Sequence, residues 1–296
     1  MSQSVQAATP RRKVRTPSSE DHSVQQLSVY RVLCVLLLIV LAALFTFPLY
    51  WIITGSFKDA VTINSPTPVW FPLNPTTGNY VRLFEKPAFA WMFNTVFLCI
   101  MSMLLTCVCA AMGGYALAKK RFFGRTFLFS LFVCAMALPK QVILIPLLKE
   151  MAFLQLHNTL WAVILPTVGW PFGVFLMKQF SETIPNELLE AARIDGAGEA
   201  RTFTQIVFPM IKPGIGALAI FTFITTWNDY FLQLIMLNDT NVLTISLGIA
   251  KLQSELSTDY GLIMAGAALG SIPIILIFLL FQKFFTRGIT MGAVKG

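Results

Sequence analysis

Long apolar runs separated by short polar segments dominate the pattern of the chain. A helix needs about 20 predominantly apolar residues to cross a bilayer. Six runs reach that length, at about 31–53, 91–117, 126–148, 159–177, 214–236 and 260–282. The pattern therefore predicts an all-α membrane protein with six transmembrane helices.

The composition agrees with this prediction. The 296 residues are 56% hydrophobic and only 12% charged, whereas soluble domains carry about 25% charged residues. The net charge of +8 does not indicate nucleic-acid binding, because the basic residues lie in the connections and not along one helix face. The five cysteines lie inside apolar runs, which is typical of small hydrophobic side chains and not of disulfides or metal sites.

The basic residues are distributed unequally across the predicted membrane. One side holds five in its connections: Lys58, Arg82, Lys86, Lys149 and Lys251. Lys140 lies within a span, and the remaining lysines and arginines lie on the side of the two termini. Since cytoplasmic connections carry the excess of basic residues, we expect a multi-pass protein with both termini in the cytoplasm.

Two regions outside the spans have a distinctive composition. Residues 1–27 are rich in Ser, Thr and Gln with a basic cluster, which predicts a disordered cytoplasmic tail ahead of a transmembrane domain over 28–296. Residues 54–90 are rich in turn residues and aromatics, so we expect an ordered segment on the outer side.

The cytoplasmic connection 183–213 predicts a helix–turn–helix. Pro185 precedes a helix over 186–194, and Asn186 can cap it. Gly196 follows where a helix needs a left-handed residue to stop. A second helix should run from about 198 to 207 and end before Pro209, and Pro213 should precede the fifth span.

The first of these helices has one apolar face. Glu190 and Arg193 are three residues apart, so they could pair on one side of the helix. The residues alone leave three interpretations open. The helix could dock in the groove of a partner protein, form an ordinary structured loop, or lie on the lipid surface.

This connection contains the sequence EAARIDGAGEARTFTQIVFPMIKP, which resembles the EAA motif of ABC importer permeases. The residues that carry the resemblance are Glu190, Ala191, Ala192, Asp195, Gly196, Ala197, Ile206 and Pro209. Phe203 meets an aromatic position of that motif, whereas Phe208 stands where the family most often has Leu. The resemblance implies that 183–213 forms coupling helices that sit in a cleft of a separate ATPase subunit.

Two further stretches are similar to the carbohydrate branch of that family. The first contains Trp227, Asn228 and Asp229. The second is the C-terminal sequence FFTRGITMGAVKG, where the matching residues are Arg287, Gly288, Gly292, Lys295 and Gly296. The resemblance covers about 28–296 and implies a type I ABC importer permease for a sugar or oligosaccharide, similar to the second permease subunit of maltose-type importers.

The resemblance also implies partners and a location. These are a second permease subunit in a heterodimer, two ATPase subunits that bind ATP and Mg²⁺, an extracytoplasmic solute-binding protein and the lipid of a bacterial plasma (inner) membrane. The chain has no phosphate-binding loop, catalytic motif or metal-ligand cluster, so we expect no enzymatic activity, cofactor or metal in it. A permease for another polar solute such as glycerol phosphate, and a stand-alone secondary transporter, remain alternatives.

Lys140 and Asp229 are charged residues within predicted spans, and such residues are usually functional. At ~1.5 Å per residue, Lys140 lies ~22 Å along the third span and Asp229 ~24 Å along the fifth. The two could pair, line a water-filled vestibule, or extend to the outer interface.

Trp227 offers a flat apolar face to a sugar, although it could equally be a packing residue. Asn228 and Asp229 offer hydrogen bonds to hydroxyls. Six helix-breaking residues mark further candidate pathway walls: Pro139, Pro146, Pro166, Gly169, Pro171 and Gly173.

Overall fold

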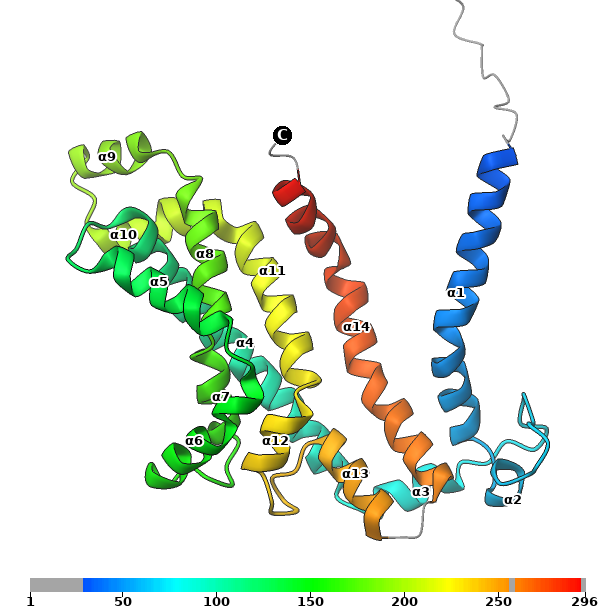
Figure 1. Cartoon of the computed structure of the whole chain (residues 1–296). Helices are drawn as coiled ribbons and strands as arrows, with labels where there is room; N and C mark the ends of the chain where they lie inside the picture. Colours follow the sequence, from blue (N-terminus) through cyan, green and yellow to red (C-terminus); the bar gives the residue numbers. More distant parts are fainter. Residues whose placement is uncertain (1–28, 256–258, 294–296) are drawn as a thin grey trace, which may run out of the picture. The chain divides into compact units, whose positions relative to one another are not determined.

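The computed structural model describes residues 29–255 and 259–293, and the regular elements within these ranges are all helices (Figure 1). The chain divides into two units, Met1–Pro48 and Leu49–Gly296. The expected disordered tail over 1–27 lies outside the described residues, as do Lys295 and Gly296. The prediction of an all-helical fold is therefore confirmed for the described part of the chain.

The helix α1 (Val29–Ser56) begins in the first unit and continues past Pro48 into the second. Within the first unit its large apolar side chains are exposed, as at Leu38 (64%) and Phe45 (78%). A helix that exposes apolar side chains all round is suited to lipid contact, because water would disfavour that surface.

Five helical segments of the described residues are long and apolar enough to cross a membrane. They are Arg31–Ser56, Ala88–Lys119, Trp161–Glu182, Glu199–Trp227 and Tyr260–Phe281. The helices α5 (Arg125–Met136) and α6 (Lys140–Phe153) make a sixth if the bent pair is counted as one span. The six predicted runs are thus all helical, but not all are single straight spans.

The predicted third span, 126–148, is wrong as a continuous helix. Its two halves, α5 and α6, meet at an angle of 108°. The break lies at Pro139, whose backbone is extended and which has no N–H to continue the helix. Proline also disfavours the helical conformation of the residue before it. Lys140 therefore begins a new helix and does not lie within a continuous one.

The predicted fifth span, 214–236, is displaced. The helix begins earlier, through α10 (Glu199–Thr202), a π-helical turn η1 (Phe203–Val207) and α11 (Phe208–Trp227). A separate helix, α12 (Tyr230–Met236), follows after a break.

The second helix of the 183–213 connection was predicted to end before Pro209. This is wrong, because the helical path continues through the π turn into α11. The Phe208 N–H donates to the Phe203 carbonyl across the π turn. Pro209 then occupies the first turn of α11, where the lost N–H costs little. Pro213 lies inside α11 and does not precede it.

The helix α4 (Ala88–Lys119) is the central contact of the second unit, packing against α8 (Phe172–Glu182), α11 and α7 (Trp161–Val168). The approach to α8 is close at Gly114, where a Cβ atom would lie 2.6 Å from the backbone of Met177 and Lys178. Gly113, beside it, faces only the side chain of Val174, at 3.6 Å.

The buried apolar residues form two clusters. One includes Trp91, Ile164, Trp227 and Leu262, and it brings together α4, α7, α11 and α14 (Tyr260–Ala293). It also takes in residues of α12 and of α13 (Ile245–Glu255). The other includes Ala110, Met177, Leu189 and Ile211, and it reaches from α4 and α8 to α9 (Asn186–Ile194).

The segment 54–90 is folded, as expected, around α2 (Ala60–Ile63) and α3 (Gly78–Phe84). The buried Asn79 amide donates to the carbonyls of Ser56 (2.9 Å) and Lys58 (2.8 Å). The Lys58 ammonium donates to the Val69 carbonyl (2.5 Å) and lies 4.2 Å from the ring centroid of Trp51. Burial of this ammonium lowers the pKa of Lys58.

Candidate functional site

The helix α9 lies at the end of the bundle where α8 ends and the α10–α11 segment begins (Figure 1). Leu189 belongs to the second cluster, and Ala192 is also buried. Leu188 (43%) and Ile194 (87%) are exposed, as is Ala191 between them. These three residues share a face at helical spacing and form what we call the α9 stripe.

The start of α9 differs from the prediction. Pro185 holds the capping position, and Asn186 is the first helical residue. The Asn186 side-chain oxygen instead accepts from the Lys119 ammonium (3.0 Å), which also donates to the Ile184 carbonyl (2.5 Å). Proline has no side-chain acceptor, so α9 begins without a side-chain cap, and Lys119 fixes α9 to the end of α4.

The end of α9 agrees with the prediction. Gly196 has φ of +76°, in the left-handed region. Its N–H donates to the Arg193 carbonyl (3.0 Å), and the Ala197 N–H donates to the Ala192 carbonyl (2.9 Å). This pair of bonds is a Schellman motif, which satisfies the last carbonyls of the helix and sets the direction of the chain into α10.

The expected pair between Glu190 and Arg193 does not form. Arg193 lies 3.6 Å from a carboxylate oxygen of Glu199, beyond the turn, and the Lys120 ammonium contacts the other oxygen of that carboxylate. Two cations thus converge on Glu199, which draws Arg193 away from its own helix. Glu190 is exposed beside the α9 stripe.

The remaining residues of the predicted coupling set are spread over the same segment. Asp195 and Gly196 form the turn, and Ala197 follows it half-buried. Ile206 lies half-buried in the π turn, and Pro209 is exposed in the first turn of α11. The set therefore marks the turn and the two helices that it joins, and does not form one cluster.

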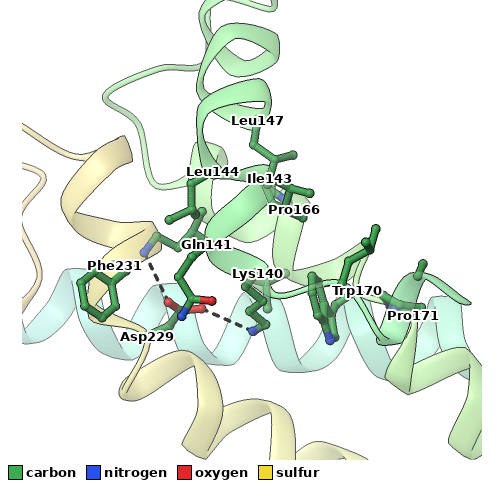
Figure 2. A pocket seen from close by; sticks show the side chains of 15 residues that line it. Lys140, Gln141, Ile143, Leu144, Leu147, Pro166, Trp170, Pro171, Asp229 and Phe231 are labelled. Carbon is green, nitrogen blue, oxygen red and sulfur yellow. Dashed lines mark hydrogen bonds and ion pairs between the residues drawn. The ribbon is translucent and has the colours of Figure 1, made fainter. Parts of the chain in front are cut away.

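A cavity of about 320 Å³, which we call the α6 cavity, lies where three helix breaks meet. The breaks are those between α5 and α6, between α7 and α8, and between α11 and α12. Its walls include Gln141 and Leu144 of α6, Pro166 and Trp170 near the second break, and Phe231 of α12 (Figure 2). Broken helices at membrane depth are tolerated where they line a cavity.

Lys140 and Asp229 form an ion pair in the α6 cavity, with the Lys140 ammonium 3.5 Å from a carboxylate oxygen. The other oxygen of Asp229 accepts from the Leu232 N–H (3.3 Å) and so caps α12. Figure 2 shows the Lys140 ammonium between Asp229 and Trp170, whose ring centroid is 4.8 Å away. The sequence placed the two residues at similar depth but left open whether they pair, and it assumed two straight helices.

Trp227 and Asn228 lie outside the α6 cavity. Trp227 is only 5% exposed, and its ring packs on Phe223 with centroids 5.7 Å apart. Asn228 is exposed and donates to the Ile224 carbonyl (2.8 Å). The structure thus brings Lys140 and Asp229 together and places Trp227 in the core.

Trp170 and Gln141 line the α6 cavity but were not among the residues predicted from the sequence. Trp170 stands between Gly169 and Pro171, two helix breakers that the sequence did mark, so an aromatic residue inside a helix break was the available signal. Gln141 gave no signal, because its place in the cavity depends on the unpredicted break at Pro139. Within the described residues, no group of His, Cys, Asp and Glu side chains is arranged to hold a metal ion.

A second cavity, of about 230 Å³, adjoins the first and shares Lys140, Thr167 and Trp170 with it. We call it the Thr106 cavity, because Thr106 of α4 forms part of its wall. Thr222 and Thr225 of α11 also line it, so its wall is richer in hydroxyl groups than that of the α6 cavity.

Comparisons with known proteins found related sequences and a similar fold. Residues 108–291 match the family described as the binding-protein-dependent transport system inner membrane component. The arabinooligosaccharides transport system permease protein AraQ of Bacillus subtilis is 34% identical over 278 residues, 92% of this chain and 98% of that protein. The trehalose/maltose transport system permease protein MalG of Thermococcus litoralis is 31% identical over 274 residues, 90% of this chain and 97% of that protein.

Among solved structures, the fold is similar to that of a chain from a bacterial ABC transporter involved in the import of the acidic polysaccharide alginate. The TM-score is 0.79 at 20% identity, and the match covers 88% of this chain and 98% of that chain.

Proposed function

Because the chain belongs to the family of binding-protein-dependent transport system inner membrane components, we propose that it is the membrane-spanning permease subunit of an ATP-driven importer for a sugar or oligosaccharide. The observation that carries this proposal is the match, over nearly the whole chain, to permeases named for oligosaccharides and disaccharides. The match to an alginate importer chain supports the fold of such a subunit.

The α9 stripe supports a role in coupling. An exposed apolar face on a helix, fixed by Lys119 at one end and by the Schellman turn at the other, fits the groove of a partner protein. In the proposed importer, Glu190, Ala191, Ala192, Asp195, Gly196, Ala197, Ile206 and Pro209 belong to the segment that transmits motion from an ATPase subunit to α11. Glu190 lies beside the stripe, where a basic residue of the ATPase could reach it.

The proposed assembly contains two ATPase subunits, a second permease subunit and an extracytoplasmic solute-binding protein. ATP and Mg²⁺ bind to the ATPase subunits, so this chain hydrolyses nothing itself. The excess of basic residues at the α9 end supports a cytoplasmic position for that end and for both termini, in a bacterial plasma (inner) membrane.

The substrate pathway is proposed to pass the α6 cavity. Lys140 and Asp229 line it and offer a donor and an acceptor for sugar hydroxyls. Asn228 is exposed beside Asp229 and can make a further hydrogen bond. Trp227 supports the pathway as a packed residue behind these side chains.

Reconstitution tests the proposed function. The chain is co-expressed with its neighbouring permease and ATPase genes and placed in liposomes with the solute-binding protein outside. We expect uptake of at least one labelled sugar among arabinotriose, maltotriose, trehalose and galactobiose, dependent on ATP inside. Uptake by the chain alone, without any ATPase, would instead support a stand-alone secondary transporter. Uptake of glycerol phosphate but of no sugar would support the alternative permease.

A substitution in the α9 stripe tests the coupling role. Ile194→Asp places a charge on the most exposed apolar residue of the stripe, and burying it in a partner would cost at least about 1.5 kcal/mol, roughly tenfold in affinity. We expect the ATPase subunit to co-purify at least tenfold less, with permease abundance unchanged. Phe123→Asp, at a fully exposed residue beyond the end of α4, is the matched control. Equal ATPase recovery with both variants would refute the coupling role of the stripe.

A further inference from the structure

Three helices of the bundle contribute much of the wall of the Thr106 cavity. Thr106 belongs to α4, Gly173 to α8, and Thr222 and Thr225 to α11. Lys140 and Trp170 stand at its junction with the α6 cavity, because they line both. A molecule in the α6 cavity would therefore meet the Thr106 cavity next.

The hydroxyl group of Thr106 has no partner among the described residues, although the residue is only 4% exposed. Threonines in helices commonly donate to the carbonyl four residues earlier, as Thr225 does to Phe221 (2.8 Å) and Thr167 does to Val163 (2.8 Å). Buried hydroxyls are almost always hydrogen-bonded, and leaving one unpaired is costly. Thr106 lines the cavity, and its hydroxyl is therefore a buried group whose hydrogen bond is not made within the described residues.

The other groups at the cavity also suit a molecule with hydroxyl groups. The hydroxyl oxygens of Thr167 and Thr225 keep lone pairs that can accept, because each donates its own hydrogen to a carbonyl. The Lys140 ammonium has three hydrogens and gives one to Asp229. Trp170 adds an aromatic ring, against which the apolar C–H groups of a sugar can pack.

The charges restrict the class of molecule further. Among the described residues that line the two cavities, Lys140 and Asp229 are the ionisable ones, and they pair with each other. The site therefore has no net charge to offer an acidic substrate, because the one ammonium is already neutralised.

We propose that the Thr106 cavity is a binding subsite for an uncharged saccharide, with the Thr106 hydroxyl as a hydrogen-bonding residue, Trp170 as the apolar wall, and Lys140 as a donor shared with the α6 cavity. This rests on the proposed function, and it assigns to this subunit a direct part in recognising the substrate.

The test compares three variants in the reconstituted importer, with the best-transported neutral sugar of the panel as substrate. Thr106→Val removes the hydroxyl and keeps the shape of the side chain. Thr106→Ser keeps the hydroxyl. Thr226→Val is the matched control, because the Thr226 hydroxyl is also buried and unpartnered but lines neither cavity.

We expect Thr106→Val to raise the KM for uptake about two- to tenfold, the effect of one lost hydrogen bond, with Vmax nearly unchanged. Thr106→Ser and Thr226→Val should stay near the wild-type KM. A KM for Thr106→Val no higher than that of Thr226→Val overturns the subsite. Inhibition by trigalacturonate as strong as inhibition by the neutral sugar overturns the uncharged class. If the wild-type importer takes up no sugar of the panel, the proposed function itself fails, which separates that failure from failure of the subsite.

Discussion

At the scale of single residues, the pair of Lys140 and Asp229 is the central feature. Each lies at the start of a helix that follows a break, and Asp229 has two tasks, since one oxygen faces Lys140 and the other caps α12. The Asp229 side chain is 18% exposed and that of Lys140 45%, so solvent screens part of the attraction. The pair therefore serves the charge balance of the cavity more than the stability of the fold.

Removing the two charges in turn should show that they act together. Asp229→Asn keeps a side chain that can cap α12 but removes the negative charge. We expect Asp229→Asn and Lys140→Met each to raise the KM for sugar uptake severalfold. The free-energy cost of the double variant, calculated from its KM, should be smaller than the sum of the two single costs by about 0.5–1 kcal/mol.

The control for this cycle is Lys149→Met, which removes an exposed ammonium further along α6. Its effect should add to that of Asp229→Asn, because the two residues are not paired. If the effects of Lys140→Met and Asp229→Asn on KM are equally additive, the ion pair has no role in uptake.

At the residue level the sequence pattern could single out unusual charges, but it could not show which partners or packing each residue has. Lys140 and Asp229 could be singled out because charges within an apolar run are costly, so few are tolerated. Trp227 could not be assigned, because a tryptophan suits a sugar site and an apolar core equally well. Its place beside Phe223 depends on how α11 rotates, which the sequence pattern does not show.

At the scale of elements, the close contact between α4 and α8 determines how firmly the second unit is held together. Gly114 lets the α8 backbone approach α4 so closely that no side chain fits between them. Small residues at such contacts are the usual means by which membrane helices associate, because dispersion contacts replace the hydrophobic effect there.

A pair of adjacent glycines provides the test. Gly114→Ala forces a methyl group against the backbone of Met177 and Lys178, so we expect a loss of about 1–3 kcal/mol and a lower Tm of the purified protein in detergent. Gly113→Ala, where the nearest atom is 3.6 Å away, should leave the Tm unchanged or raise it, since alanine favours a helix. A similar fall in Tm for both variants would show that helix packing at Gly114 is not the cause.

The elements themselves were predictable where the apolar runs were uninterrupted, as in α1, α4 and α14. The breaks were not, although their residues were visible in the sequence. Pro139 lies in the break between α5 and α6, whereas Pro209 and Pro213 lie in a helical path that continues through the π turn. The difference is structural, because the π turn before Pro209 reorganises the hydrogen bonds that a proline would otherwise disrupt.

At the scale of the whole molecule, the sequence predicted an all-helical membrane protein and its family, and the comparisons confirm both. The cavities could not be predicted, since each is formed by residues from helices far apart in the chain. Thr106 and Thr225 line one cavity across more than a hundred residues of sequence. No periodicity within a single helix carries that information.

The π turn at Phe203–Val207 has a consequence for insertions and deletions. A π turn holds one residue more than an α-helical path between the same end points. Deleting one residue there would leave the faces of α10 and α11 in their present alignment. A deletion within α11 would instead rotate every later residue by about 100°. The loss of one residue is therefore tolerable in the π turn. One or two helical turns further along α11, the same loss would misalign the residues that line the Thr106 cavity.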